Sequence, residues 1–175
     1  MRKMKKKYLG VMTGTSLDGV DIALCAVDKE VCSLEAYESI PFDLNLKKKV
    51  LRLIEGNISL KDVGEVDCHL ANFFAKCINT FLAKYSCAKE DIVAIGLHGQ
   101  TLWHEPNGEY PFTMQLGNAS VLAVETGLDV VADFRSKDIA LGGQGAPFAP
   151  AFHQFLFGHL EKCVVLNIGG MSNIS

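Results

Sequence analysis

The sequence predicts an α/β fold: a mixed sheet, antiparallel over its first three strands, that is flanked by helices. Two apolar runs, YLGVM and VDIALCAV, lie on either side of a polar loop, and a third run over residues 31–40 alternates as a half-buried strand does. After Pro41 the apolar residues recur with the period of a helix. Helical and strand-like segments then alternate along the chain, an order typical of a sheet with helices on its faces.

Each later element has its own signal in the sequence. Apolar residues recur at helical spacing over residues 46–54, and Gly56 stands where a C-terminal cap belongs. A second helix is expected to begin at Ser59, with Asp62 completing a partial capping box. The remaining expected elements are a buried strand over 92–97, a loop over 98–106, a return strand over 112–117, a helix over 118–125, a buried strand over 128–134, a glycine-rich loop over 135–147 and an apolar stretch over 147–157.

The end of the sequence resembles its beginning. The segment VVLNIGGMSNIS repeats the features of LGVMTGTSLDGVDIAL in the same order: a strand, glycines, small polar residues and a return strand. We therefore expect a first domain over residues 1–162 and the start of a second, like domain over residues 163–175. On this interpretation the chain is the amino-terminal half of a longer protein.

Composition narrows the class of protein. The chain has 175 residues, is 49% hydrophobic and has a formal net charge of −3, which suits one domain core and gives no reason to expect nucleic acid as a partner. No apolar run approaches the roughly 18 residues of a membrane-spanning helix. The basic residues at the start are not followed by the apolar run of a signal peptide. Six scattered cysteines form no C-x-x-C pair, so zinc is not expected. We expect a soluble, cytoplasmic protein with no membrane partner.

The loop TGTSLDG is longer than a hairpin needs and is rich in small donors. Consecutive backbone N–H groups in a tight turn bind anions, and hydroxyl side chains add donors, so the loop is a candidate phosphate site. Asp18 and Asp21 would suit a magnesium ion, which prefers oxygen ligands. The loop lacks the Gly-Lys-Ser/Thr of a Walker motif and leads into a strand. An ordinary hairpin with a polar tip is the alternative, and the partial repeat in NIGGMSN favours phosphate.

Polar residues follow the two strands expected at 92–97 and 128–134, and ligands of open sheets bind at the carboxyl ends of strands. A hydroxyl- and carboxylate-bearing ligand would suit them, and an arginine in particular pairs with a carboxylate. Alternatively, His98 is a hydrogen-bonded turn residue and Arg135 forms a surface ion pair with Asp138. The candidates are His98, Gln100, Asp133, Arg135 and Gln144, the last being the specifying side chain of GGQGAP.

Five segments together closely resemble the anhydro-N-acetylmuramic acid kinases: GVMTGTSLDGVD, GLHGQTLWHEP, MQLGN, VVADFRSKDIALGGQGAPFAPAFH and VLNIGGMSNIS. These enzymes belong to the sugar kinase, Hsp70 and actin superfamily. The resemblance implies two ribonuclease-H-like (actin-like ATPase) domains with ATP and Mg²⁺ between them. It implies that the first hairpin binds phosphate, which here gives the cofactor-binding residues Gly14, Thr15, Ser16, Leu17, Asp18, Gly19, Val20 and Asp21.

The resemblance also implies a reaction. Enzymes of this family hydrolyse the 1,6-anhydro bond of anhydro-N-acetylmuramic acid and phosphorylate O6 in one event, giving N-acetylmuramic acid 6-phosphate for the recycling of peptidoglycan sugars. The general base is an aspartate in an Asp-Thr/Cys-Gly-Pro-Gly-Asn segment downstream of NIGG, and nothing in this chain matches it. We therefore expect no catalytic residue within the chain and no turnover by the chain alone. Thr13 stands where the family often has serine, which keeps the hydroxyl.

Two other functions remain open. A plain sugar kinase of the same superfamily would use the same phosphate loop without a hydrolytic step, and the downstream base would distinguish the two. A non-catalytic sugar- or nucleotide-sensing module would use the same fold only to report a ligand. A homodimer is compatible with each of these functions.

Overall fold

The computed structural model describes residues 6–28, 31–56, 58–168 and 173–175. The chain divides into two units, one formed by Met1–Trp103 with Met114–Ala132 and the other by His104–Thr113 with Asp133–Ser175.

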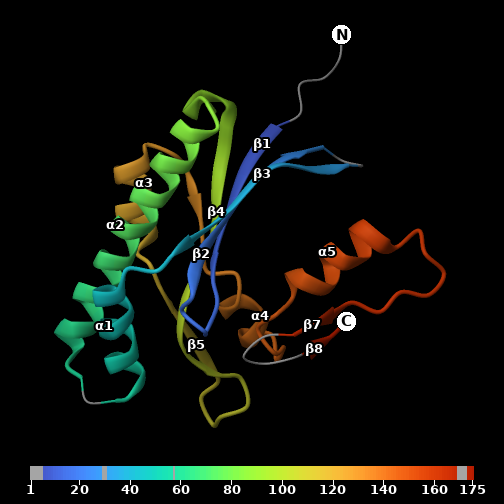
Figure 1. The fold of residues 1–175 in the computed structure, drawn as a ribbon. Coiled ribbons are helices and arrows are strands. Elements are labelled where there is room, and N and C mark those ends of the chain that lie inside the picture. The colour runs from blue at the N-terminus through green and yellow to red at the C-terminus, as the bar shows by residue number, and fades with distance from the viewer. Residues whose placement is uncertain (1–5, 29–30, 57, 169–172) are drawn as a thin grey trace. The chain divides into compact units, whose positions relative to one another are not determined.

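The central sheet confirms the predicted mixed topology (Figure 1). Its first three strands are antiparallel neighbours, and β4 lies parallel to β1. The order is β3-β2-β1-β4-β5, and β6 also pairs with β4 in parallel. This is a ribonuclease-H-like arrangement, and its strands are β1 (Lys6–Thr13), β2 (Gly19–Val27), β3 (Cys32–Pro41), β4 (Ile92–Glu105), β5 (Phe112–Leu116) and β6 (Val130–Val131).

One face of the first unit's sheet packs on helices. Every second residue of β2 is buried, from Val20 to Ala26, as expected for a strand with one face on the core. The helices α1 (Leu44–Ile54), α2 (Leu60–Lys84) and α3 (Ala119–Thr126) lie on the same side of the strands in Figure 1. Phe74 and Phe81 of α2 are fully buried in this core.

The helix boundaries follow the local signals in the sequence. Ser59 caps α2, and the capping box with Asp62 is complete in both directions, since each side chain binds the other residue's backbone N–H. Asn118 caps α3, and Gly127 ends it in the left-handed conformation with a φ of 70°. The predicted helix starts are therefore confirmed at the residue level.

Two strand predictions were wrong in length. The strand predicted over residues 92–97 continues to Glu105, so the segment interpreted as a loop after it is the second half of β4, where β5 supplies a hydrogen-bonding neighbour. The strand predicted over 128–134 is reduced to Val130–Val131. It ends early because Asp133 has a φ of 56°, which is incompatible with an extended strand.

The second unit contains α4 (Ser136–Ala140), α5 (Phe148–Phe157), β7 (Leu166–Asn167) and β8 (Asn173–Ile174), and a 3-10 turn, η1 (Lys89–Asp91), precedes β4 in the first unit. The short helix α4 lies inside the segment predicted to be a glycine-rich loop. β7 and β8 pair antiparallel, as expected for a strand and its return strand, while the glycine pair between them lies outside the described residues. None of the helices in the described part of the chain has the length and apolar character to cross a membrane.

Candidate functional site

The loop between β1 and β2 is held in place by one of its own side chains. Leu17 is 1% exposed and packs into the core, and its backbone N–H donates to the Gly14 carbonyl at 3.2 Å. Leu17 adopts a φ of 52°, which is strained for a branched side chain. Thr15 and Ser16 at the tip are exposed. The loop is therefore a short turn whose hydroxyls face solvent above a buried anchor.

Contacts from later elements hold this loop at its start and near its tip. The buried Thr13 hydroxyl donates to the Gly99 carbonyl of β4 at 3.1 Å. Near the tip, Lys47 of α1 donates from Nζ to the Ser16 carbonyl at 3.2 Å and lies 3.7 Å from the Asp18 carboxylate. Lys47 was missed from the sequence, because its position beside the loop depends on how α1 packs. A Cβ on Gly19 would lie 2.8 Å from the Ile40 carbonyl oxygen, so only glycine fits there.

The two candidate metal ligands differ in their surroundings. The Asp18 side chain is 80% exposed and pairs with Lys47. Asp21 lies on β2, on the face opposite the core, where its Oδ1 accepts a hydrogen bond of 2.7 Å from the Tyr37 hydroxyl. That hydrogen bond raises the pKa of Tyr37 above its ordinary value. Within the described residues, no group of three or more His, Cys, Asp and Glu side chains is placed to hold a metal ion.

His98 and Gln100 lie inside β4. The Nδ1 atom of His98 is 2.8 Å from the Gly99 carbonyl, which also accepts from Thr13, so Nδ1 carries the proton if this contact is a hydrogen bond. Gln100 is fully buried; its amide nitrogen donates to the Thr101 carbonyl at 3.3 Å, and its Oε1 is buried without a partner in the described part of the chain. A ligand can reach this amide only if the chain around it moves.

The other three candidates lie in the second unit, around α4. Asp133 has a left-handed backbone, and its Oδ1 accepts from the Ser136 N–H at 3.1 Å, so its carboxylate begins the turn into α4. The Arg135 guanidinium is part-buried and donates from Nη1 to the Gly145 carbonyl at 2.7 Å. Burial lowers the pKa of Arg135 from its ordinary value. The structure thus brings Asp133, Arg135 and the Gln144 loop together within one unit, and places His98 and Gln100 in the other.

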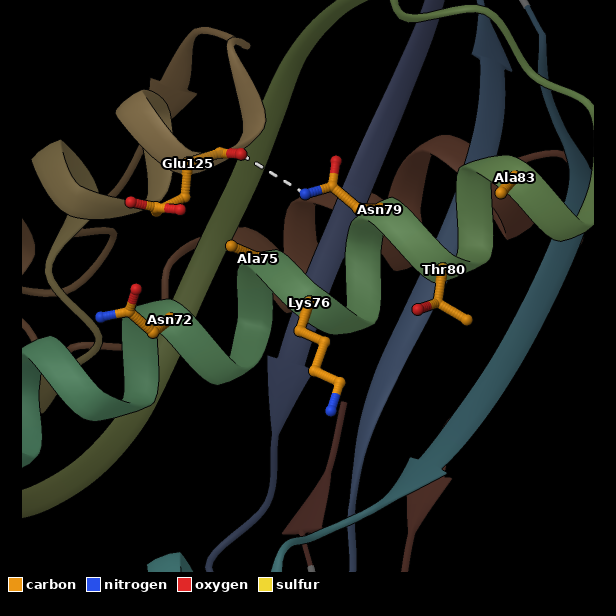
Figure 2. Close-up of a pocket in the computed structure, with 7 residues that line it drawn as sticks. All are labelled: Asn72, Ala75, Lys76, Asn79, Thr80, Ala83 and Glu125. Atoms are coloured by element: carbon orange, nitrogen blue, oxygen red, sulfur yellow. Dashed lines mark hydrogen bonds between the residues drawn. The ribbon is translucent and has the colours of Figure 1, made fainter.

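A separate groove lies on the outer side of α2 and α3, as Figure 2 shows. Asn79 donates from Nδ2 to the Glu125 carbonyl across it at 3.4 Å. None of the candidate residues from the sequence lines this groove, which is bounded by Asn72, Ala75, Lys76, Asn79, Thr80, Ala83 and Glu125.

Comparison with known proteins places the chain in a family. The profile of the anhydro-N-acetylmuramic acid kinases (AnmK) matches residues 6–175. A Sulfurovum sp. (strain NBC37-1) protein described as anhydro-N-acetylmuramic acid kinase is 56% identical over 172 residues, 98% of this chain and 48% of that protein. A second protein of that description, from Sulfurimonas denitrificans (strain ATCC 33889 / DSM 1251), is 53% identical over 173 residues, 98% of this chain and 47% of that protein. The chain spans about half the length of these curated relatives, and it belongs to the anhydro-N-acetylmuramic acid kinase family.

Proposed function

We propose that the protein is an ATP-dependent kinase that opens the 1,6-anhydro ring of anhydro-N-acetylmuramic acid and phosphorylates O6. Its product would be N-acetylmuramic acid 6-phosphate, and the reaction would be a step in peptidoglycan recycling. The family match and the names of the relatives support this substrate. The structural observation that carries the proposal is the β1–β2 loop, whose exposed hydroxyls and turn backbone are fixed by the buried Leu17.

In this proposal the residues Gly14–Asp21 bind the phosphates of ATP. The loop is already held by Leu17 and by Lys47, so little ordering entropy is lost when the anion binds. Lys47 adds a positive charge beside the loop and is a further candidate for contact with phosphate. Asp18 fits a Mg²⁺ ion bound directly or through water because its carboxylate is exposed, and Asp21 fits less well because Tyr37 occupies one of its oxygens. Such an ion would neutralise charge that develops on the phosphates.

The residues proposed to bind the sugar are the polar candidates predicted from the sequence. Arg135 is suited to the lactyl carboxylate, because a part-buried guanidinium pairs strongly with a carboxylate. His98, Asp133 and Gln144 are proposed to contact sugar hydroxyls or the acetamido group. Gln100 completes the set of proposed residues, and its unpartnered Oε1 makes it a candidate to accept a hydrogen bond once the surrounding chain moves.

The chemistry needs a group that this chain does not supply. A carboxylate base would take a proton from water as the water attacks the anomeric carbon, and the bond between that carbon and O6 would break. O6 would then accept the γ-phosphoryl group of ATP, with ADP as the leaving group. No residue of the chain matches the family's base, so residues 1–175 alone are expected not to turn over substrate. Measurable kinase activity from that fragment would contradict this expectation.

Isotope labelling of the full-length gene product tests the function. The protein is mixed with ATP, Mg²⁺ and anhydro-N-acetylmuramic acid in oxygen-18 water, and the sugar product is weighed by mass spectrometry. A phosphorylated sugar with heavy oxygen at the anomeric carbon supports coupled hydrolysis and transfer. Phosphate without the label indicates a plain sugar kinase, and ligand binding without any product indicates a sensing module.

A cytoplasmic location and a homodimer belong to the same proposal. All six cysteines are free thiols in the structure, which agrees with a reducing compartment. Sedimentation of the full-length protein would test the homodimer, since a single species at the monomer mass would exclude it.

A further inference from the structure

Gly145, in the loop after α4, is held by two side chains, one bonded to its N–H and the other to its carbonyl. The Gly145 N–H donates to Oδ2 of Asp138 at 2.7 Å, while the Gly145 carbonyl accepts from Nη1 of Arg135 at 2.7 Å. The Gly143 N–H donates to the Asp138 carbonyl at 2.8 Å. All of these residues belong to the second unit. The backbone on both sides of Gln144 is therefore fixed, although Gln144 itself is exposed.

Gln144 is paired with an exposed amide from the turn between β4 and β5. Its Nε2 donates to Oδ1 of Asn107 at 3.1 Å, and both residues belong to the same unit. A primary amide carries one carbonyl and one NH₂ group, so this pair leaves one carbonyl oxygen, on Gln144, and one NH₂ group, on Asn107, for other partners. Rotating both amides exchanges the roles but still leaves one acceptor and one donor.

We propose that Asn107 and Gln144 together bind the acetamido group of the sugar. This inference rests on the proposed function, and it adds Asn107 as a residue that determines specificity. An acetamido group has one N–H and one carbonyl, which match the Gln144 oxygen and the Asn107 NH₂. A carboxylate fits less well, because it offers only acceptors and would place an oxygen against the Gln144 carbonyl. The two hydrogen bonds that Gly145 makes with Asp138 and Arg135 fix the backbone next to Gln144, so little ordering entropy is lost when the ligand binds.

The sharpest test is Asn107→Asp in the full-length enzyme. The carboxylate still accepts the hydrogen bond from Gln144 but replaces the outward donor with an oxygen. Two substrates are compared by kcat/KM: anhydro-N-acetylmuramic acid and an analogue with a hydroxyl in place of the acetamido group. We expect kcat/KM for the natural sugar to fall about tenfold, mainly through KM, with the analogue changed much less. Gln144→Ala, which removes the acceptor, should show the same selective loss.

The matched control is Asn72→Asp on α2. Asn72 is an exposed asparagine whose amide donates to the Cys68 carbonyl, so the change adds the same charge away from the proposed contact. It should leave the ratio of the two kcat/KM values unchanged. Equal losses on both substrates for Asn107→Asp and Gln144→Ala, or no loss on either, would overturn the inference while leaving the kinase proposal intact. A wild-type enzyme that phosphorylates neither sugar would overturn both.

Discussion

The residue Leu17 offers a test of how the candidate phosphate loop is built. Its side chain is 1% exposed in the core, and this burial stabilises the fold. Its backbone φ of 52° is strained and destabilises the fold. Truncation to alanine removes buried methyl groups and should lower the free energy of unfolding by about 2–5 kcal/mol. Truncation to glycine removes one more methyl, worth about 0.8 kcal/mol. Glycine also relieves left-handed strain of about 1–2 kcal/mol.

We expect Leu17→Gly and Leu17→Ala to differ in free energy of unfolding by less than about 1 kcal/mol. The relieved strain of about 1–2 kcal/mol offsets the lost methyl, about 0.8 kcal/mol, together with the backbone entropy that glycine adds to the unfolded chain, about 0.5–1 kcal/mol. Ile22 is the control, since it is fully buried in β2. There glycine has no strain to relieve and gains backbone entropy in the unfolded chain, so Ile22→Gly should be less stable than Ile22→Ala by about 1.5 kcal/mol.

Urea unfolding of residues 1–175 can measure all four variants through the fluorescence of Trp103, the single tryptophan of the chain. The test compares two differences in the free energy of unfolding: that between the glycine and alanine variants at position 17, and that between the glycine and alanine variants at position 22. If both positions show the same difference, the left-handed backbone of Leu17 stores no strain and the reasoning fails.

Three further changes can be checked directly. The mutation Asp21→Asn should lower the pKa of Tyr37 toward its ordinary value, since the hydrogen bond to the carboxylate raises it; titration by tyrosine absorbance measures this, and an unchanged curve would contradict the contact. In the unmutated protein, the hydrogen bond from Tyr37 to Asp21 stabilises the fold fully at pH values below the ordinary pKa of tyrosine. This stabilisation is lost as the pH rises through the raised pKa of Tyr37. Burial raises the pKa of the Cys77 thiol to about 11, so iodoacetamide at pH 8 should modify the exposed Cys68 well before Cys77, as peptide mass spectrometry would record. Gly64 is exposed within α2 with open space around it, so Gly64→Ala should raise the midpoint of thermal unfolding by stabilising the helix about 0.5–1 kcal/mol; a lower midpoint would show that a side chain is not tolerated there.

The elements that could be predicted from the sequence are those set by neighbouring residues. The capping box at Ser59 and the glycine cap at Gly127 act within one helical turn, so their residue types are sufficient to place them. The first three strands also follow from alternation and short turns. These features depend on contacts a few residues apart.

The features that were missed depend on contacts between distant residues. Polar residues such as His98 and Gln100 suggested a loop, yet β5 pairs with this segment and makes it a strand. Lys47 reaches the β1–β2 loop only because of the way α1 packs, and no local pattern predicts that. The partner of Gln144, Asn107, is 37 positions away in the sequence. Long-range geometry therefore decides much of the candidate site.

The position of β1 in the sheet has a consequence for synthesis of the chain. β1 pairs with β2 on one side and with β4 on the other, and Thr13 at its end bonds to Gly99, 86 residues later. As the chain leaves the ribosome, β1 to β3 can pair at once, but the second edge of β1 stays uncovered on the order of 10 s until β4 emerges. An open strand edge invites pairing with other chains. The half-made protein is thus most exposed to aggregation in the interval before residues 92–99 appear, when a chaperone would protect it most.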